Sequence, residues 1–378
     1  MVDQNLVRWG ILGTGWIAGQ FAKDLQRVPG ATLAGAASRS LSNAQRFAES
    51  FTDCQPYASY QALVEATDID VVYVATPHVR HHEDCLLALN AGKPVLCEKP
   101  FAINRQEAEQ IFATAKAKNL FCMEAMWMRF IPLIREVRRI VQQGELGEIR
   151  FITADFGYPV GFSAENRLFN PELGGGALLD RGCYPLSLAV YLLGKPQQIT
   201  GFAHMGPTGV DEQCSMLLQY ANGAFAQLAA TVQTYSTNQA VIAGTRGQLV
   251  IKPPFFYPES LAVHQFPDRE TMTATVPSSL PTDLKGRLKS TLKANSWYKR
   301  LRRLRPKGGK TMTQVDGGNG YQYQAIEVGR CLQAGLLESP LMPWSDTLQV
   351  LELMDSLRDS WQLRYAQDDG LTISEEYR

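Results

Sequence analysis

The sequence predicts a mixed α/β fold of two domains, an N-terminal parallel sheet alternating with helices and a C-terminal α/β domain with a large, mostly antiparallel open sheet. The 378 residues are too many for one ordinary hydrophobic core. A glycine-rich turn near the start joins a buried strand to a helix, and later segments alternate apolar with polar residues around hairpin turns. We place the domains at 1–122 and 123–378, with a basic insertion at 278–318 in the second.

Composition limits the class of protein. Apolar residues make up 45% of the chain and charged residues 20%, an ordinary globular balance. The seven cysteines are scattered and form no C-x-x-C pair, which argues against a disulfide framework and against a zinc site. No apolar run approaches the roughly 18 residues of a membrane span, and the start lacks a basic leader. We therefore expect reduced thiols, a cytoplasmic location and no membrane span.

The first strand leads into a dinucleotide fingerprint. Residues 6–12 read as a buried strand, and Gly13-Thr14-Gly15-Trp16-Ile17-Ala18 follows as a G-x-G-x-x-A turn that opens a helix through about Val28. Gly13 permits the tight turn, Gly15 lets the backbone approach a pyrophosphate, and Ala18 keeps the helix close to the sheet. We expect the first five residues of this run to contact a bound dinucleotide, which makes the first domain a Rossmann domain.

The second strand indicates which dinucleotide is bound. Residues 32–37 form an apolar strand that ends at Ser38 and Arg39. An enzyme that uses NAD usually has an acid at this position for the ribose 2′-hydroxyl, whereas hydroxyls and an arginine suit a 2′-phosphate. The sequence therefore favours NADP over NAD, although Arg39 could instead be a solvated turn residue.

The third strand, residues 70–75, ends in a turn rich in histidine. Three of the five histidines of the chain, His78, His81 and His82, follow Thr76 and Pro77. They are adjacent or three apart with no cysteine nearby, and hydride transfer needs no Lewis acid from the protein. We therefore predict cofactor packing and helix capping here, and no metal.

The fourth strand, residues 95–97, ends in Glu98-Lys99-Pro100. The carboxyl ends of parallel strands form the ligand crevice of an open sheet, so Lys99 should point into a site. A partly buried lysine can serve as a proton donor or as a fixed positive charge. Pro100 stiffens this turn, and a cis peptide before it would hold the ammonium in one orientation. Beyond it, Asn104 is a candidate N-cap of the next helix.

These motifs carry a resemblance to a known family. Gly13-Thr14-Gly15, Thr76-Pro77 with His81, and Glu98-Lys99-Pro100, in this order and spacing, resemble the glucose-fructose oxidoreductase, inositol dehydrogenase and rhizopine catabolism (Gfo/Idh/MocA) family. The resemblance implies that Lys99 lies at the active site beside the nicotinamide, with Thr76, Pro77, His78, His81 and Glu98 around the cofactor. It departs at His78, where the family usually has asparagine.

The run at 121–132 crosses into the second domain. Its E-A-x-W-x-R-F-x-P pattern resembles the dihydrodiol dehydrogenase branch of the family, whose members also oxidise D-xylose with NADP. That resemblance implies that Arg129 faces the cofactor and Trp127 the substrate pocket. Interdomain packing is the alternative for both side chains.

A second chemical locus follows three glycines at 174–176. Asp180 and Tyr184 are four apart on a predicted helix, so they should share a face and could orient a hydroxyl substrate, while the glycines would allow a polyol to approach closely. The resemblance implies that Tyr184 is the general acid/base. A free tyrosine has a pKa near 10, so we expect Lys99 to lower it. The alternative is a buried structural pair.

The remainder of the chain reads as a sheet and two returning helices. Residues 213–220 and 224–232 predict one hairpin, 240–243 and 248–252 a second, and 321–337 and 345–361 have helical periodicity. The resemblance implies that the free face of this sheet pairs two subunits into a homodimer.

The basic insertion is separate from these elements. Residues 285–310 hold eleven Lys or Arg and no acidic residue, although the formal net charge of the whole chain is zero. Two short amphipathic patterns lie within it. Such a segment can make weak contacts with anions or with a membrane surface, or it can simply be solvated.

We conclude that the sequence predicts an NADP-dependent oxidoreductase. Hydride would pass between nicotinamide and a secondary alcohol or lactol carbon of a cyclic polyol, such as an aldopentose or a trans-dihydrodiol. Tyr184 would exchange the hydroxyl proton, Lys99 would fix the oxygen, and Asp180 would bind a neighbouring hydroxyl. Two alternatives stay open: a non-catalytic NADP-binding sensor of the same fold, and a sugar-to-sugar oxidoreductase with tightly held cofactor.

Overall fold

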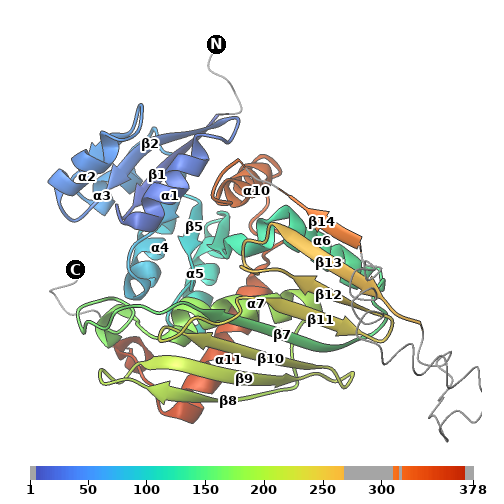
Figure 1. Cartoon of the computed structure of the whole chain (residues 1–378). Coiled ribbons are helices and arrows are strands. Elements are labelled where there is room, and N and C mark those ends of the chain that lie inside the picture. The colour runs from blue at the N-terminus through green and yellow to red at the C-terminus, as the bar shows by residue number, and fades with distance from the viewer. Residues whose placement is uncertain (1–5, 268–309, 315–316, 371–378) are drawn as a thin grey trace, which may run out of the picture.

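A computed structural model describes residues 6–267, 310–314 and 317–370. Two sheets dominate it, each formed largely by one half of the chain (Figure 1). The fold class predicted from the sequence is confirmed.

The first sheet has six parallel strands in the order β3-β2-β1-β4-β5-β6. The strands are β1 (Val7–Leu12), β2 (Ala31–Ala37), β3 (Gln55–Tyr57), β4 (Val71–Val74), β5 (Val95–Glu98) and β6 (Cys122–Ala125). The helices between them are α1 (Trp16–Leu25), α2 (Leu41–Ala48), α3 (Tyr60–Glu65), α4 (His81–Asn90) and α5 (Arg105–Ala117). This is the doubly wound order, whose ligand crevice lies at the carboxyl ends of the strands.

Helix starts follow the local sequence. The Asn104 side chain accepts a hydrogen bond from the backbone of Glu107, so the predicted N-cap of α5 is confirmed. Every residue of β4, β5 and β6 is buried, which explains their continuous apolar runs. Strand β6 continues to Ala125, three residues beyond the domain boundary that we expected after residue 122.

The second sheet has eight strands in the order β14-β13-β12-β11-β7-β10-β9-β8. They are β7 (Ile149–Gly157), β8 (Gln198–Met205), β9 (Asp211–Gln219), β10 (Phe225–Thr231), β11 (Ala240–Gly244), β12 (Gly247–Ile251), β13 (Ser260–Gln265) and β14 (Lys310–Thr313). All neighbours are antiparallel except β7 and β10. Both predicted hairpins are present, as β9–β10 and β11–β12.

One face of this sheet is covered and the other is open. Helix α7 (Cys183–Leu193) packs on β7 and β10, and α11 (Trp344–Trp361) packs on α7 and β8. The other face presents exposed apolar side chains, namely Phe151, Phe202, Leu217 and Phe225. Along β9, buried and exposed residues alternate, so the exposed apolar side chains lie on the face opposite to the one that the helices cover.

The two halves are joined by the return of the chain. Helix α10 (Gln322–Gln333) packs against α1 (Figure 1). Just before it, the backbone N–H groups of Asn319 and Tyr321 donate to the carboxylate of Asp24 in α1, at 2.8 and 3.0 Å. Asp24 is buried, so these bonds satisfy a charge that would otherwise be costly.

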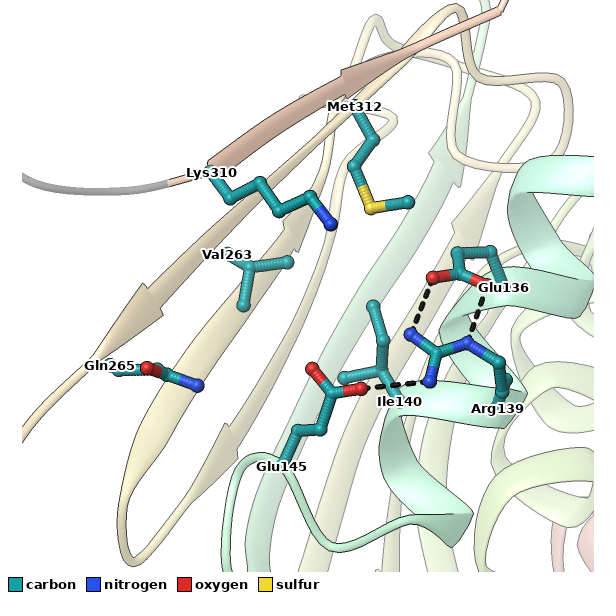
Figure 2. Close-up of a pocket in the computed structure, with 8 residues that line it drawn as sticks. All are labelled: Glu136, Arg139, Ile140, Glu145, Val263, Gln265, Lys310 and Met312. Carbon is teal, nitrogen blue, oxygen red and sulfur yellow. Dashed lines mark hydrogen bonds and ion pairs between the residues drawn. The ribbon is translucent and has the colours of Figure 1, made fainter.

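A small groove lies at the far edge of the second sheet, between α6 (Pro132–Gln142) and the strands β13 and β14 (Figure 2). There Arg139 forms ion pairs with Glu136 at 2.6 Å and with Glu145 at 2.9 Å. The groove of about 200 Å³ is separate from the cleft described below.

The basic insertion lies mostly outside the described residues. Its expected range, 278–318, includes Lys310–Thr313, which form the edge strand β14. Among the helices that the structure describes, none is both long and apolar enough to cross a bilayer.

Candidate active site

A cleft of about 550 Å³ collects nearly all the predicted site residues. Its lining consists of Gly13, Thr14, Gly15, Trp16, Ile17, Ser38, Arg39, Asn43, Tyr60, Ala75, Thr76, Pro77, His78, His81, Glu98, Lys99, Trp127, Arg167, Asp180, Tyr184 and Tyr321. The first sheet supplies one side, and residues from Trp127 onward supply the other. Arg129 is the predicted residue that is not part of this lining.

The glycine-rich turn has the shape that a pyrophosphate needs. Gly13 has a φ of +92°, and a side-chain carbon added there would lie 2.7 Å from the carbonyl oxygen of Ala75. A side-chain carbon on Gly15 would meet nothing within 4 Å, so this position opens onto free space, and it caps α1. An anion over the turn would therefore meet the N-terminus of a ten-residue helix without obstruction. These residues fit a dinucleotide.

The carboxyl end of β2 provides a polar corner of the cleft. Ser38 is buried and Arg39 is exposed, and both line the cleft beside Asn43 and Tyr60. Burial raises the pKa of Tyr60 to about 12, so its hydroxyl keeps its proton and can donate. No acidic side chain is among the cleft residues of this corner.

His81 ties two of the cleft turns together. Its Nδ1 lies 2.8 Å from the carbonyl oxygen of Pro100 and its Nε2 lies 3.0 Å from that of Thr76. Burial lowers the pKa of His81 to about 4, so the ring is neutral and donates to one of these carbonyls. In the part of the chain that the structure describes, no group of three His, Cys, Asp or Glu is placed to hold a metal.

Lys99 projects from the end of β5 onto Asp180. Its Nζ donates to the backbone oxygen of Asp180 at 2.8 Å and to Oδ1 at 3.2 Å. Burial alone would lower the pKa of Lys99, but the acidic groups around it, Asp180 first among them, together outweigh burial and raise the pKa. Lys99 is therefore a fixed ammonium rather than a base. The Lys99–Pro100 peptide is cis.

Asp180 is the carboxylate of the site. Burial opposes its ionisation, but the charges of Lys99 and Arg167 outweigh burial and hold the pKa of Asp180 well below its usual range. Arg167 Nη2 donates to the same oxygen as Lys99, at 3.0 Å. Asp180 is therefore ionised at every ordinary pH.

Tyr184 lines the cleft. The indole Nε1 of Trp127 donates to this hydroxyl at 2.9 Å, and the ammonium of Lys99 lies over the phenol ring, 5.0 Å from its centroid. Burial raises the pKa of Tyr184 well above its usual value. The expected lowering of this pKa is not seen, because burial is the largest influence on the phenol and the ammonium of Lys99 donates to Asp180.

Two expectations about the second chemical locus also need correction. Asp180 does not lie on a regular α-helix but in a π-helical turn, Leu178–Gly182, that precedes α7. The glycines before it do not face a substrate. A side-chain carbon on Gly175 would meet three carbonyl oxygens of residues 167–170 within 2.9 Å, and one on Gly176 would meet Asp211 at 2.3 Å. The glycines therefore allow the backbone to pack tightly behind the site.

Arg129 lies away from the cleft, contrary to expectation. Its guanidinium is fully buried, donates to Ser187 at 2.8 Å and pairs with Asp346 at 2.5 Å. A buried guanidinium needs such partners, so Arg129 joins the segment after β6 to helices α7 and α11. The alternative of interdomain packing describes it better. Trp127 both lines the cleft and packs on Tyr321, with ring centroids 4.8 Å apart.

Sequence reasoning missed five lining residues: Asn43, Tyr60, Ala75, Arg167 and Tyr321. Arg167 lies at the end of a loop, whose position in space cannot be predicted from hydrophobic periodicity. Tyr321 could be predicted only as the start of a helix. The strand end before Thr76 could have indicated Ala75, because residues at carboxyl ends of parallel strands line the crevice.

Comparison with known proteins agrees with this geometry. A family model described as an oxidoreductase family with NAD-binding Rossmann fold matches residues 7–126, and a model of the GFO/IDH/MocA C-terminal domain matches residues 134–250. Trans-1,2-dihydrobenzene-1,2-diol dehydrogenase of Xenopus tropicalis is 33% identical over 92% of this chain and 96% of its own length. The human protein of the same name is 30% identical over 96% of this chain and 99% of its own.

Solved structures show the same fold. A 3-ketoreductase from Actinomadura kijaniata, in complex with NADP and TDP-benzene, matches with a TM-score of 0.74 and 28% identity, covering 94% of this chain and 97% of that one. An aldose-aldose oxidoreductase from Caulobacter crescentus matches with a TM-score of 0.75 and 22% identity, covering 94% and 98%. The latter likeness concerns the fold alone.

The fold and the cleft together define an oxidoreductase that uses a nicotinamide dinucleotide. The chain belongs to the Gfo/Idh/MocA family, as its motifs indicate, and it is a dehydrogenase of that family. The prediction of an enzyme is confirmed.

Proposed function

We propose that this protein transfers hydride between NADP and a secondary alcohol or lactol carbon of a cyclic polyol or sugar. The observation that carries the proposal is the meeting of Lys99, Asp180 and Tyr184 in the cleft that also contains the glycine-rich turn. A bound nicotinamide would supply the carbon that gives or accepts the hydride. Relatives named as diol dehydrogenases and a neighbouring ketoreductase support this class of substrate.

The protonation states of the side chains assign their roles. Tyr184 holds its proton because its pKa is raised, so it suits proton donation to a carbonyl oxygen during reduction and must take a proton back during oxidation. Lys99 keeps a positive charge beside the reacting oxygen and stabilises negative charge that develops there. Asp180 can accept a hydrogen bond from a neighbouring substrate hydroxyl.

The corner at the end of β2 supports NADP as the preferred cofactor. Ser38, Arg39 and Asn43 offer hydroxyl, guanidinium and amide groups at the position where an acid would repel a 2′-phosphate. The ketoreductase relative from Actinomadura kijaniata binds NADP. We therefore assign the 2′-phosphate to Arg39.

Two properties of the whole protein belong to the same proposal. The open face of the second sheet, with Phe151, Phe202, Leu217 and Phe225 exposed, supports a homodimer formed by that face. The seven cysteines are all free and buried, which supports a reducing compartment such as the cytoplasm.

The alternative of a non-catalytic sensor is less well supported. A sensor needs the dinucleotide site but has no use for a buried tyrosine and an ammonium beside the same carboxylate. Burying these charged and polar groups costs free energy of desolvation. An enzyme offsets that cost because the same groups stabilise its transition state.

The test is NADPH formation followed at 340 nm with purified protein, NADP or NAD, and a panel of aldoses, inositols and trans-diols. We expect turnover with NADP on at least one sugar or diol. Tight NADP binding without turnover across the panel would instead support the sensor. Nucleotide that survives purification would support sugar-to-sugar oxidoreduction.

A further inference from the structure

We infer that Arg167 recognises an oxyanion of the substrate, so that the preferred sugar or polyol carries a carboxylate or a phosphate ester. This inference rests on the proposed function and specifies the substrate class of the same cleft. Arg167 pairs with Asp180, which Lys99 also contacts, and it is the more exposed of the two cations.

The backbone that carries Arg167 is held firmly against the glycine-rich turn of the second domain. The carbonyl oxygen of Leu168 accepts from the N–H of Gly176 at 2.9 Å, and the carbonyls of residues 167, 168 and 170 lie so close to Gly175 that any side chain there would collide with them. The position of the Arg167 α-carbon is thus fixed by the same turn that positions Asp180.

The side chain of Arg167 is only partly used by the protein. Its Nη2 donates to Asp180 Oδ1 at 3.0 Å, yet half of the side chain is exposed, whereas those of Lys99 and Asp180 are 13% and 10% exposed. Arg167 therefore lines the cleft with a side chain that stays accessible to solvent. A planar guanidinium matches the paired oxygens of a carboxylate or phosphate.

The charges around Asp180 do not balance without a ligand. This carboxylate faces Lys99 at 3.2 Å, Arg167 at 3.0 Å and Arg181 at 3.7 Å. The other carboxyl group of the cleft, Glu98, is buried and accepts from Tyr73 at 2.5 Å. Within 4 Å, three cations face the single carboxylate of Asp180, and two of them, Lys99 and Arg167, line the cleft, so this end of the cleft is positive and favours an anion.

His78 orients the guanidinium. Its Nδ1 lies 3.0 Å from the carbonyl oxygen of Gly174, so this nitrogen carries the hydrogen and donates. The other ring nitrogen, Nε2, therefore presents a lone pair, and Arg167 Nη1 lies 3.5 Å from it, a long hydrogen bond. His78 is therefore a positioning residue for Arg167.

The experiment compares matched substrates on the wild-type enzyme with NADP. For each aldose, the neutral sugar, its uronic acid and its phosphate ester are measured, and the ratio of kcat/KM for the anion to that for the neutral sugar is the readout. We expect a ratio above one for the uronic acid or the phosphate, and the better of the two identifies the oxyanion. Activity on neutral sugars with ratios below one would overturn the inference while leaving the proposed function intact. Absence of turnover on every member would count against the proposed function itself.

The variant Arg167→Gln tests the residue. Losing one charge-assisted bidentate contact should lower the anion-to-neutral ratio by roughly ten- to a hundredfold, and Arg167→Lys should restore part of it. Arg364→Gln is the matched control, because Arg364 is 61% exposed and pairs with one carboxylate, Asp359, outside the cleft. NADP affinity is measured in parallel by fluorescence titration. A loss confined to NADP affinity, with the ratio unchanged, would assign Arg167 to the cofactor and overturn the inference.

A double-mutant cycle tests the role of His78. His78→Asn keeps a donor near Nδ1 but removes the acceptor at Nε2, whereas His78→Gln keeps an acceptor near Nε2. We expect the asparagine variant to lower the ratio more than the glutamine variant, and to lower it no further when Arg167→Gln is already present. Equal and additive effects of both His78 variants would show that His78 acts only through folding.

Discussion

Lys99 combines three contacts that together fix its role. It donates twice to Asp180 and lies over the ring of Tyr184, so its charge sits between the carboxylate and the proton donor. Because its pKa is raised, the ammonium does not titrate in the range where the enzyme works. In the proposed mechanism, Lys99 therefore contributes charge and orientation, and Tyr184 carries the proton.

Replacing Lys99 with Met should reduce kcat by roughly 10²- to 10³-fold, because the charge that stabilises the developing oxyanion is lost. Binding of NADP should change little, since the glycine-rich turn and the end of β2 hold most of the cofactor. Stopped-flow or steady-state absorbance at 340 nm measures the first quantity and fluorescence titration the second. Lys195→Met, an exposed lysine outside the cleft, is the control. Undiminished turnover in the Lys99 variant would contradict the assignment.

Arg39 makes a separate prediction about cofactor choice. Arg39→Ala should weaken NADP binding by roughly ten- to a hundredfold and NAD binding much less, because a charge-assisted contact to the 2′-phosphate is removed. The ratio of the two dissociation constants is the measurement. Lys23→Ala, an exposed cation on α1 that does not line the cleft, should leave that ratio unchanged. If both variants behave alike, Arg39 is a solvated turn residue.

The π-helical turn Leu178–Gly182 is an element of the second domain that reaches the cleft, through Asp180. Its first N–H, on Leu178, donates to Asp211 Oδ2 at 2.7 Å, and Asp211 is fully buried at the start of β9. Burial raises the pKa of Asp211 to about 7. This carboxyl group therefore anchors the turn that carries Asp180. It also binds its proton more tightly in the folded protein than in the unfolded chain.

That raised pKa predicts how stability depends on pH. A carboxyl group whose folded pKa exceeds its unfolded value of about 4 contributes stability below pH 4 and loses it as the pH rises through about 7. Asp211→Asn removes this titration, so the fall in the free energy of unfolding between pH 5 and pH 8 should become smaller. Urea unfolding at several pH values measures it. Glu124 and Glu107, whose pKa values are also raised to about 7, should maintain the remaining dependence. An unchanged slope would contradict the account.

Among the elements, those that depend on a local sequence pattern could be predicted from the sequence. The buried strands that lead to Gly13, Thr76 and Glu98 could be predicted, because a parallel strand is largely apolar along its length. Polar and glycine residues at its carboxyl end then mark the ligand crevice. The π turn was not, since a four-residue spacing reads as a regular helix. The placement of Arg167 depends on Gly175 packing against carbonyls, a contact between segments that no single-sequence periodicity reports.

The whole molecule presents one large uncovered surface among the described residues. On the open face of the second sheet, Phe202 is 84% exposed, and Phe225 pairs in register with Phe151 on the neighbouring strand. Burying such side chains against a second copy would stabilise a dimer by roughly 25 cal/mol for each Å² of apolar surface removed from water. The opposite face of the sheet is covered by helices α7 and α11 of the same chain.

Charge on that face should separate the subunits. The double variant Phe202→Glu and Phe225→Glu should elute as a monomer, because two carboxylates on the patch would meet their copies across the interface. Light scattering coupled to size exclusion measures the mass. Leu336→Glu, at an apolar side chain outside this sheet that is 38% exposed against 39% for Phe225, should keep the wild-type mass. A wild-type protein that is already monomeric would refute the proposed dimer.

The pairing of Asp24 with Asn319 has a consequence for how the protein is made. These residues are 295 positions apart, so a ribosome working at roughly 5–20 residues per second completes the second only about 15–60 s after the first. During that interval the carboxylate of α1 lacks the two backbone donors, and Tyr321, which lines the cleft, has not been synthesised. The nascent first domain can therefore form its sheet early, but the cleft is complete only in the last stage of synthesis.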